Sequence, residues 1–191
     1  LHAAGYALLI PEMRPCATPP APQTVGYLEA RDFPVLVDYL VAEQGIMPQR
    51  IGALGWSMGG ATVLLGAAHE PRVAAVVAEG NYRNYGDLIR PPDAPLARRW
   101  LAAPLVWLFH SSTGIDPYHI APGDALHQIA PRPVFLIYGA HEPGASAGDY
   151  LARAAEVWIV PEGTHGSNYA RNPEAYAGRI LDFFAGHLLT P

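Results

Sequence analysis

The stretch Arg50-Ile-Gly-Ala-Leu-Gly-Trp-Ser-Met-Gly-Gly60 decides the fold of this 191-residue chain. It starts as a short apolar run, contains the pattern G-x-S-x-G at Gly55–Gly59, and leads into the small apolar residues of Met58–His69. The apolar run predicts a buried strand, and the small residues predict a helix that packs closely on a sheet. A serine in the sharp turn between them is placed as a nucleophile, beside the free N–H groups of the helix N-terminus. We expect both glycines of the pattern to be needed, because the backbone passes close to the serine on either side.

Five apolar runs bounded by turn residues predict the strands of the fold. They lack period-2 alternation, which indicates parallel strands that are covered on both faces. The predicted strands are Tyr6–Ile10, Arg50–Leu54, Val73–Ala78, Val134–Tyr138 and Glu156–Val160.

Segments with helical periodicity lie between these predicted strands. Apolar residues recur at three- and four-residue spacings over Tyr27–Glu43, where Pro34 should kink or delay the helix, and over Tyr176–Leu189. Together with Met58–His69, these helices alternate with the strands. The sequence therefore predicts an α/β fold: one domain over residues 1–191, with a mostly parallel sheet of about five strands and helices on both faces.

Two segments interrupt this alternation. Pro11–Thr24 is rich in proline and predicts a loop. Tyr82–Pro131 separates two predicted strands by about fifty residues, far more than a crossover requires. Its apolar residues predict a helical insertion over 82–131, and Glu79, at the end of the preceding strand, is expected to order the turn into it.

The composition excludes several classes of protein. Hydrophobic residues make up 50% of the chain and charged residues 15%, which is enough apolar material for a sizeable core. The net charge is −5 and all 12 cationic residues are Arg, which argues against nucleic acid and anionic membranes as partners. Cys16 is the only cysteine, so we expect no intrachain disulfide framework and no multi-thiolate metal site. The longest apolar run, Trp100–Phe109, is short of the roughly 20 residues that span a bilayer.

The histidines do not indicate a metal centre. His110, His119 and His127 lie in the predicted insertion, and their spacings match no pair of ligands on one helix. We therefore expect no metal ion and no organic cofactor.

Four motifs resemble the α/β-hydrolase family, and the likeness runs from Gly5 to Leu189. Gly5–Arg14 resembles a family strand that reads G-Y-x-V-L-x-P-D-x-R-G-x-G, although Pro15-Cys16-Ala17 replaces its last Gly-x-Gly. The other three resemble the nucleophile elbow, the strand before the catalytic acid and the loop of the catalytic histidine: Arg50–Gly60, Pro133–Gly139 and Val160–Gly166. The chain is most similar to single-domain serine hydrolases with a short lid, including esterases and the prolyl-oligopeptidase-like and dienelactone-hydrolase-like branches.

The resemblance implies a catalytic triad in the chain order serine, acid, histidine. Ser57 is the expected nucleophile, and it needs an adjacent base because a serine hydroxyl is a poor nucleophile at neutral pH. His165 follows a predicted strand in a glycine-flanked loop and is the expected base. Glu142 occupies the family's acid position after Gly139, with Glu in place of the usual Asp, and Asp149 is the alternative acid.

The oxyanion of an acyl-transfer reaction needs two hydrogen-bond donors. The backbone N–H of Met58, the residue after the nucleophile, is expected to be one of them. In the family the other comes from a loop after an earlier strand, whereas Tyr6–Ile10 already resembles the fourth strand of an eight-stranded sheet with the order 1-2-4-3-5-6-7-8. We therefore expect the N-terminal strands to be absent from this chain and the natural protein to be longer at its N-terminus. The alternative is that Tyr6–Ile10 pairs directly with Arg50–Leu54.

The resemblance implies acyl transfer on a small-molecule substrate. We expect hydrolysis of a carboxylic ester, or of an amide, through an acyl-enzyme on Ser57, with 82–131 as a short helical lid. Trp56, Trp100 and Trp107 are expected to contact the acyl group, the alternative being that the aromatic residues of the insertion only pack the lid. A non-catalytic binding protein with the same fold is the second hypothesis.

Overall fold

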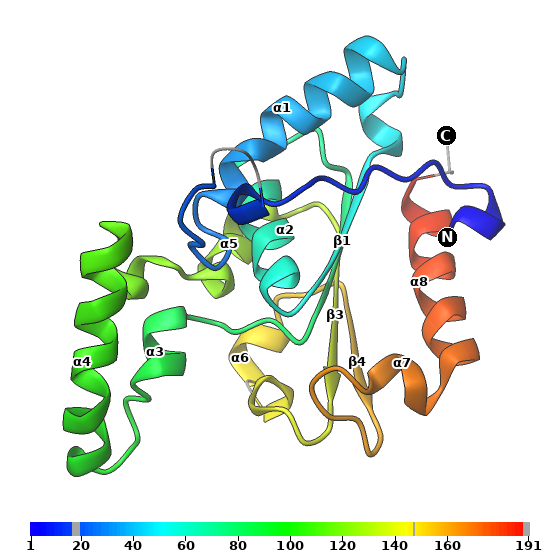
Figure 1. Cartoon of the computed structure of the whole chain (residues 1–191). Helices are drawn as coiled ribbons and strands as arrows, with labels where there is room; N and C mark the ends of the chain where they lie inside the picture. The colour runs from blue at the N-terminus through cyan, green and yellow to red at the C-terminus, as the bar shows by residue number, and fades with distance from the viewer. Residues whose placement is uncertain (17–19, 147, 189–191) are drawn as a thin grey trace.

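A computed structural model of the chain describes residues 1–16, 20–146 and 148–188 (Figure 1). Its centre is a four-stranded sheet in which every neighbouring pair of strands is parallel. The strands lie in the sheet in their chain order: β1 (Gly52–Trp56), β2 (Ala75–Glu79), β3 (Val134–Gly139) and β4 (Glu156–Val160). The structure confirms the predicted parallel α/β architecture and four of the five predicted strands.

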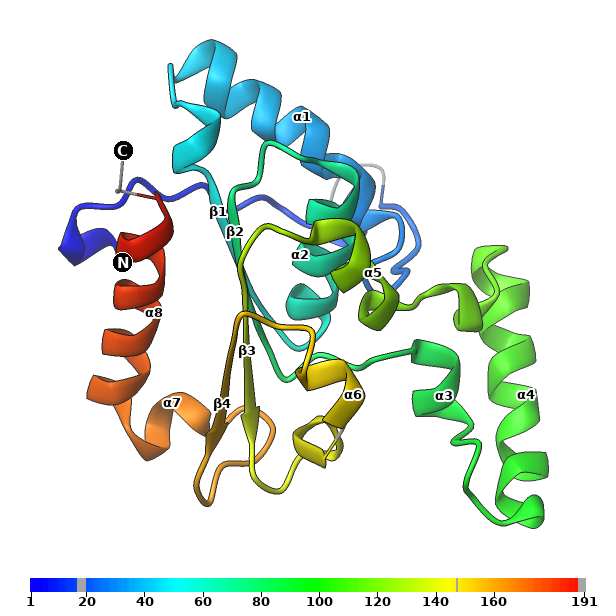
Figure 2. The ribbon, with the colours of Figure 1, turned by 180° about the vertical axis from the view of Figure 1, so that it is seen from behind.

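Helices cover both faces of this sheet, as Figures 1 and 2 show. One face carries α1 (Phe33–Asp38), α2 (Met58–His69), α5 (Pro122–Ile129) and α6 (Gly148–Leu151), and the other carries α7 (Asn168–Arg171) and α8 (Pro173–Leu188). The strands β2 and β3 are buried along their whole length, and their side chains alternate between two apolar clusters. On these strands, the cluster beneath α2 and α5 contains Val76, Ala78, Leu136 and Tyr138, and the cluster beneath α8 contains Ala75, Val77, Phe135 and Ile137.

The helix predicted over Tyr27–Glu43 is present in three parts. A 3-10 turn, η3 (Glu29–Asp32), leads into α1, and a π-helical turn, η4 (Tyr39–Glu43), follows it. Pro34 lies in the first turn of α1, where its missing N–H would have no helical acceptor. The delay predicted from Pro34 is therefore found. Further 3-10 turns include η1 (His2–Ala4), η2 (Arg14–Cys16), η5 (Pro48–Arg50) and η7 (Pro143–Ser146).

The prediction of a strand at Tyr6–Ile10 is wrong for this structure. The segment forms no strand, does not pair with β1, and leaves Ile10 85% exposed. Its Tyr6 ring packs instead near Phe184 of α8, with the ring centroids 6.3 Å apart. Apolar side chains favour a strand only where a neighbouring strand can pair with its backbone. Within the described residues β1 is an edge strand paired only with β2, and Tyr6–Ile10 does not pair with its free edge, so the backbone of this segment has no strand partner.

The predicted insertion 82–131 contains helices with two different roles. Its last helix, α5, packs on α2 and buries Ala125, Leu126 and Ile129 in the core, so it is a crossover helix of the sheet. The rest forms a projecting part that we call the arm (Figure 2). The arm consists of α3 (Tyr85–Ile89), α4 (Leu96–Thr113) and η6 (Pro117–His119).

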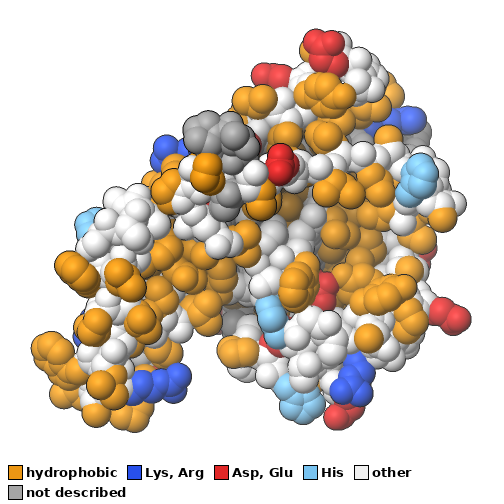
Figure 3. Space-filling model, viewed as in Figure 1, with side chains coloured by type: hydrophobic (Ala, Val, Ile, Leu, Met, Phe, Trp, Pro, Cys, Tyr) orange, Lys and Arg blue, Asp and Glu red, His pale blue; other side chains and the backbone are white. Residues whose placement is uncertain are grey.

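The arm exposes a large apolar surface. Figure 3 shows hydrophobic side chains gathered along it, at the left of the molecule. On α4 each of the following is more than half exposed: Leu96, Trp100, Leu101, Leu105, Trp107 and Leu108. Across the described ranges, no helix has both the length and the hydropathy needed to cross a membrane.

Arg132 joins the ends of two helices on one face of the sheet. Its guanidinium donates to the carbonyls of Ala67 at 2.7 Å, Glu70 at 3.0 Å and Val73 at 2.8 Å, at and just beyond the end of α2. Its Nε donates to the carbonyl of Ile129 at the end of α5, 3.1 Å away. Helix C-termini present carbonyls without helical donors, and a guanidinium supplies those donors. Burial lowers the pKa of Arg132, but the group remains a cation because an arginine is not deprotonated in proteins.

We expect Arg132→Ala to lower the free energy of unfolding by about 2–3 kcal/mol, because four carbonyls lose a charged donor. Urea unfolding followed by circular dichroism measures this change. Arg50→Ala is the matched control, since Arg50 is exposed and none of the described side-chain hydrogen bonds involves it. Equal unfolding midpoints for the two variants would contradict this role of Arg132.

Candidate active site

Ser57 forms the turn between β1 and α2 at the carboxyl edge of the sheet. Its backbone has φ 55° and ψ −118°, a conformation that residues other than glycine rarely adopt. Its N–H donates to the carbonyl of Glu79, 2.7 Å away, at the end of the neighbouring strand β2. The strained turn is therefore tied to the sheet, and it places Ser57 at the N-terminus of α2.

The two glycines of the G-x-S-x-G pattern are not equivalent. A Cβ on Gly55 would lie 2.1 Å from the carbonyl oxygen of Gly59, a distance that no side chain tolerates. A Cβ on Gly59 would meet nothing within 4 Å. The expectation that both positions require glycine is therefore wrong for Gly59, because it is the Gly59 backbone that crowds Gly55.

Three side chains from three separate loops form a continuous hydrogen-bonded chain. Ser57 Oγ lies 2.9 Å from Nε2 of His165, and Nδ1 of His165 lies 3.1 Å from Oε2 of Glu142. Ser57 follows β1, Glu142 lies just beyond β3, and His165 lies between β4 and α7. Parallel strands end at the same edge of a sheet, so residues that are far apart in the chain meet there.

Within this line of hydrogen bonds, the Glu142 carboxylate is buried, whereas the His165 imidazole is accessible to solvent. Glu142 is 8% exposed, and the side chain of His165 is 50% exposed. The oxygen of Glu142 that faces away from His165, Oε1, accepts hydrogen bonds from the N–H of Gly139 at 2.7 Å and the amide of Asn168 at 3.1 Å. A carboxylate held by these donors can orient the imidazole, because its other oxygen is left to face Nδ1.

Gly80 allows the end of β2 to pass directly against these two side chains. It has φ +59°, and a Cβ there would lie 3.0 Å from Oε2 of Glu142 and 3.1 Å from Nδ1 of His165. Any larger residue would be strained by its backbone angle and would crowd the imidazole.

Asp149, the alternative acid, lies on the short helix α6. It is exposed, and in the part of the chain that the structure describes it makes no hydrogen bond to His165. The structure therefore brings Glu142, and not Asp149, to the histidine.

Trp56 and Met58, the two neighbours of Ser57, also lie at this site. The Trp56 indole stacks on the His165 ring, with centroids 5.2 Å and planes 29° apart, and the residue is 51% exposed. Met58 is the first residue of α2, so its N–H has no acceptor within the helix and faces the position where helix N-termini bind anions. The Met58 sulfur accepts a hydrogen bond from the Gln23 amide at 3.0 Å. The flat indole of Trp56 and the backbone N–H of Met58 thus both lie beside Ser57.

Trp100 and Trp107, the other two predicted substrate residues, lie on the arm. Figures 1 and 2 place α4 well apart from the end of β1, which Ser57 follows. The inner side of α4 carries Phe109, whose ring lies 5.1 Å from that of Tyr85 on α3. Trp100 precedes Phe109 by nine residues and therefore lies half a turn away, on the outer side of the helix. The structure does not bring these two tryptophans to the serine, which corrects the predicted acyl pocket.

Three further residues extend the hydrogen-bonded chain behind Glu142. The Asn168 amide nitrogen donates to Glu142 and also to Oε1 of Glu79, 2.9 Å away, and the Tyr176 hydroxyl donates to the other oxygen of Glu79. From the sequence, Glu79 is expected only to order a turn. One feature of the sequence could have indicated that Glu79 lies at the site: it ends β2, the strand beside β3. Asn168 and Tyr176 belong to no motif.

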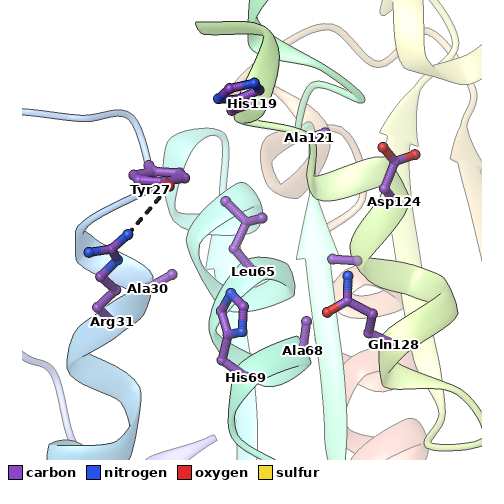
Figure 4. Close-up of a pocket in the computed structure, with 11 residues that line it drawn as sticks. Tyr27, Ala30, Arg31, Leu65, Ala68, His69, His119, Ala121, Asp124 and Gln128 are labelled. Carbon is purple, nitrogen blue, oxygen red and sulfur yellow. Dashed lines mark hydrogen bonds between the residues drawn. The ribbon is translucent and has the colours of Figure 1, made fainter. Parts of the chain in front are cut away.

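A pocket of about 440 Å³ lies away from this site, between η3, α2 and α5 (Figure 4). Tyr27, Leu65, His119 and Asp124 are among the residues that line it. Leu65 is eight residues beyond Ser57 on α2, which is about 12 Å along a helix axis, so the pocket is separate from the serine. In the described residues, no group of three or more His, Cys, Asp or Glu is placed to hold a metal ion.

Solved structures with the same arrangement identify the fold as that of the α/β hydrolases. The Pyrococcus furiosus esterase Pf2001 is 20% identical, with a TM-score of 0.62 over 87% of this chain and 65% of the esterase. A Pyrococcus horikoshii acylaminoacyl peptidase is 18% identical, with a TM-score of 0.63 over 86% of this chain and 28% of the peptidase. A hypothetical protein from Pseudomonas aeruginosa is 22% identical, with a TM-score of 0.59 over 84% of this chain and 68% of that protein.

The family follows from the sequence of the same region. The model of the Prolyl oligopeptidase family matches residues 23–140, a range that includes Ser57. The chain belongs to the prolyl oligopeptidase family, which places it among the serine hydrolases and confirms the resemblance to α/β hydrolases. No curated protein matches the chain.

We expect Gly55→Ala to lower the free energy of unfolding by more than about 3 kcal/mol, because the new methyl group would overlap the Gly59 carbonyl. Gly59→Ala is the matched control within the same pattern, and it should change that free energy by no more than about 1 kcal/mol. Chemical unfolding of the two purified variants gives both values. A Gly55→Ala protein as stable as the unsubstituted chain would contradict the close approach at this turn.

Proposed function

We propose that the chain is a serine hydrolase that cleaves a carboxylic ester through an acyl-enzyme on Ser57. One observation carries the proposal: the hydrogen-bonded chain from Ser57 Oγ through the His165 ring to the buried carboxylate of Glu142. A nucleophile, a base and an orienting acid at hydrogen-bond distances are the groups that acyl transfer requires. The chemistry needs neither a metal ion nor an organic cofactor.

In the first half of the reaction, Ser57 Oγ attacks the carbonyl carbon of the ester and Nε2 of His165 accepts the hydroxyl proton. The carbonyl oxygen becomes an oxyanion, which the Met58 N–H at the positive end of α2 stabilises. When the tetrahedral intermediate collapses, the bond to the leaving oxygen breaks and His165 gives that oxygen its proton. An alcohol leaves, and the acyl group remains on Ser57.

In the second half, a water molecule attacks the acyl-enzyme while His165 accepts one of its protons. The bond between the acyl group and Ser57 breaks, the carboxylic acid leaves, and the proton returns from His165 to Ser57. Throughout, Glu142 accepts a hydrogen bond from Nδ1, keeps the imidazole in one tautomer and stabilises its positive form.

The exposure of the site and its donors favour a small ester as the substrate. His165 and Trp56 are each half exposed, so a small molecule can reach the serine, and the flat indole offers an apolar wall beside it. Met58 N–H is one oxyanion donor at this site. An ester carbonyl is more electrophilic than an amide carbonyl, and an alkoxide leaves more readily than an amine anion, so an ester requires less stabilisation than an amide. Both an esterase and a peptidase are among the similar structures, so an amide is the second substrate class to test.

We expect the chain to hydrolyse a short-chain nitrophenyl ester and to be labelled by a fluorophosphonate at Ser57. Ser57→Ala should abolish the labelling and reduce turnover by about 1,000-fold or more, with an unchanged circular dichroism spectrum. Mass spectrometry of the labelled peptide identifies the site. Labelling at another residue would contradict the assignment of Ser57, and a folded chain that is not labelled at all would favour the non-catalytic binding protein.

We expect Glu142→Gln to reduce kcat by about 100-fold or more, because a neutral amide does not stabilise the imidazolium that forms on His165. Asp149→Asn is the matched control, since it removes a carboxylate from the same connection between β3 and β4 without touching the hydrogen-bonded chain; its kcat should stay within about twofold. Steady-state kinetics on the nitrophenyl ester compare the two. The reverse ranking would assign the acid to Asp149.

A further inference from the structure

We propose that Asn168 and Glu79 are positioning residues for the Glu142 carboxylate. Asn168 aims that carboxylate at His165, and Glu79 holds the Asn168 amide in the orientation that allows it to do so. The inference rests on the proposed function, and it concerns two side chains that act through Glu142 rather than on the substrate.

Asn168 links two carboxylates through a single nitrogen atom. Its side chain is fully buried at the start of α7, and its Nδ2 lies 3.1 Å from Oε1 of Glu142 and 2.9 Å from Oε1 of Glu79. An amide nitrogen carries two hydrogens, so each carboxylate receives one. The hydrogen bond to Oε1 holds one end of the Glu142 carboxylate, and Oε2 at its other end then faces His165.

This orientation of the amide leaves one polar atom unpaired. The Oδ1 atom of Asn168 is buried without a hydrogen-bond partner among the described residues, which destabilises the fold. The two ends of an amide have nearly the same shape, so a half-turn of the side chain would exchange them. If the Asn168 amide were turned in this way, its Oδ1 would face the carboxylates of both Glu79 and Glu142 and would be repelled by both. The second carboxylate therefore strengthens the preference for the orientation that serves Glu142.

Glu79 is itself held by a residue of α8. It is 5% exposed at the end of β2, and its Oε2 accepts a hydrogen bond from the Tyr176 hydroxyl on α8. Burial, together with the hydrogen bond to Glu79, raises the pKa of Tyr176, so the hydroxyl keeps its proton and remains a donor at neutral pH. A continuous line of hydrogen bonds thus runs from Tyr176 on α8, through Glu79, Asn168 and Glu142, to His165.

The charges of the cluster fit a role in the reaction better than a role in stability. Glu70, another buried glutamate, is paired with Arg72 at 2.7 Å, but Glu79 and Glu142 form no ion pair with an arginine in the described ranges. Burying two carboxylates without a cation is unfavourable. The positive charge that develops on His165 during acyl transfer lies next to Glu142, which Asn168 links to Glu79.

The test measures kcat and KM of the full chain on the nitrophenyl ester after Glu79→Gln. This substitution keeps the size of the side chain and adds a donor that can bond to Oδ1 of Asn168, so the amide is free to turn round. We expect kcat to fall about 10-fold or more while KM stays within about twofold, because a misplaced acid impairs the chemical step and not substrate binding. Glu70→Gln is the matched control: it should lower the unfolding midpoint and leave kcat within about twofold.

Tyr176→Phe tests the same line of hydrogen bonds with a smaller change. If Glu79→Gln does not fold, Tyr176→Phe provides the test of the positioning role. It removes only the hydroxyl that holds Glu79, so we expect a smaller fall in kcat, about threefold or more, again at constant KM. An unchanged kcat in every folded variant of Glu79 and Tyr176, with an active unsubstituted chain, overturns the positioning role alone. An unsubstituted chain that is not labelled at Ser57 overturns the proposed function, and this inference with it.

Discussion

Parallel pairing of the four strands is the constraint on which the rest of the structure depends. It sets Trp56 beside Glu79 and Gly139 beside Val160, so the carboxyl ends of all the strands form one row. The serine, the acid and the histidine are supplied by the loops that continue from this row, and each side chain has only a short distance to reach. The sheet therefore fixes the approximate position of every group before any side-chain contact is made, and hydrogen bonds of about 3 Å complete the arrangement.

Most of the fold could be predicted from the sequence, because a parallel strand covered on both faces is apolar along its whole length. β2 and β3 are buried at every position, and their runs were unambiguous. The same signal failed at Tyr6–Ile10, since an apolar run carries no information on whether a partner strand is present. It also could not separate α5 from the arm within 82–131, because both contain many apolar residues and the run of apolar residues alone does not show which helix packs on the sheet.

The candidate site could be predicted only where a residue follows a strand at a motif position. Ser57, Glu142 and His165 meet that condition, and the structure brings them within hydrogen-bond distance of one another. Asn168 and Tyr176 do not meet it: they join the site because α7 and α8 pack beside the ends of β2 and β3, a contact that no local pattern encodes. The direction of the arm tryptophans was missed for a similar reason, since it depends on which side of α4 packs on α3.

The agreement between strand order and chain order has a consequence for biosynthesis. Each strand pairs with the strand that leaves the ribosome just before it, so the sheet can grow by addition at one edge, with few contacts between distant parts of the nascent chain. The turn that carries Ser57 is made early, but His165, whose Nε2 lies 2.9 Å from Ser57 Oγ, is 108 residues further on. A chain released before that point lacks the imidazole that forms a hydrogen bond with Ser57. Under the proposed function, a product that ends before His165 is therefore unable to carry out acyl transfer, whatever part of the sheet it has already formed.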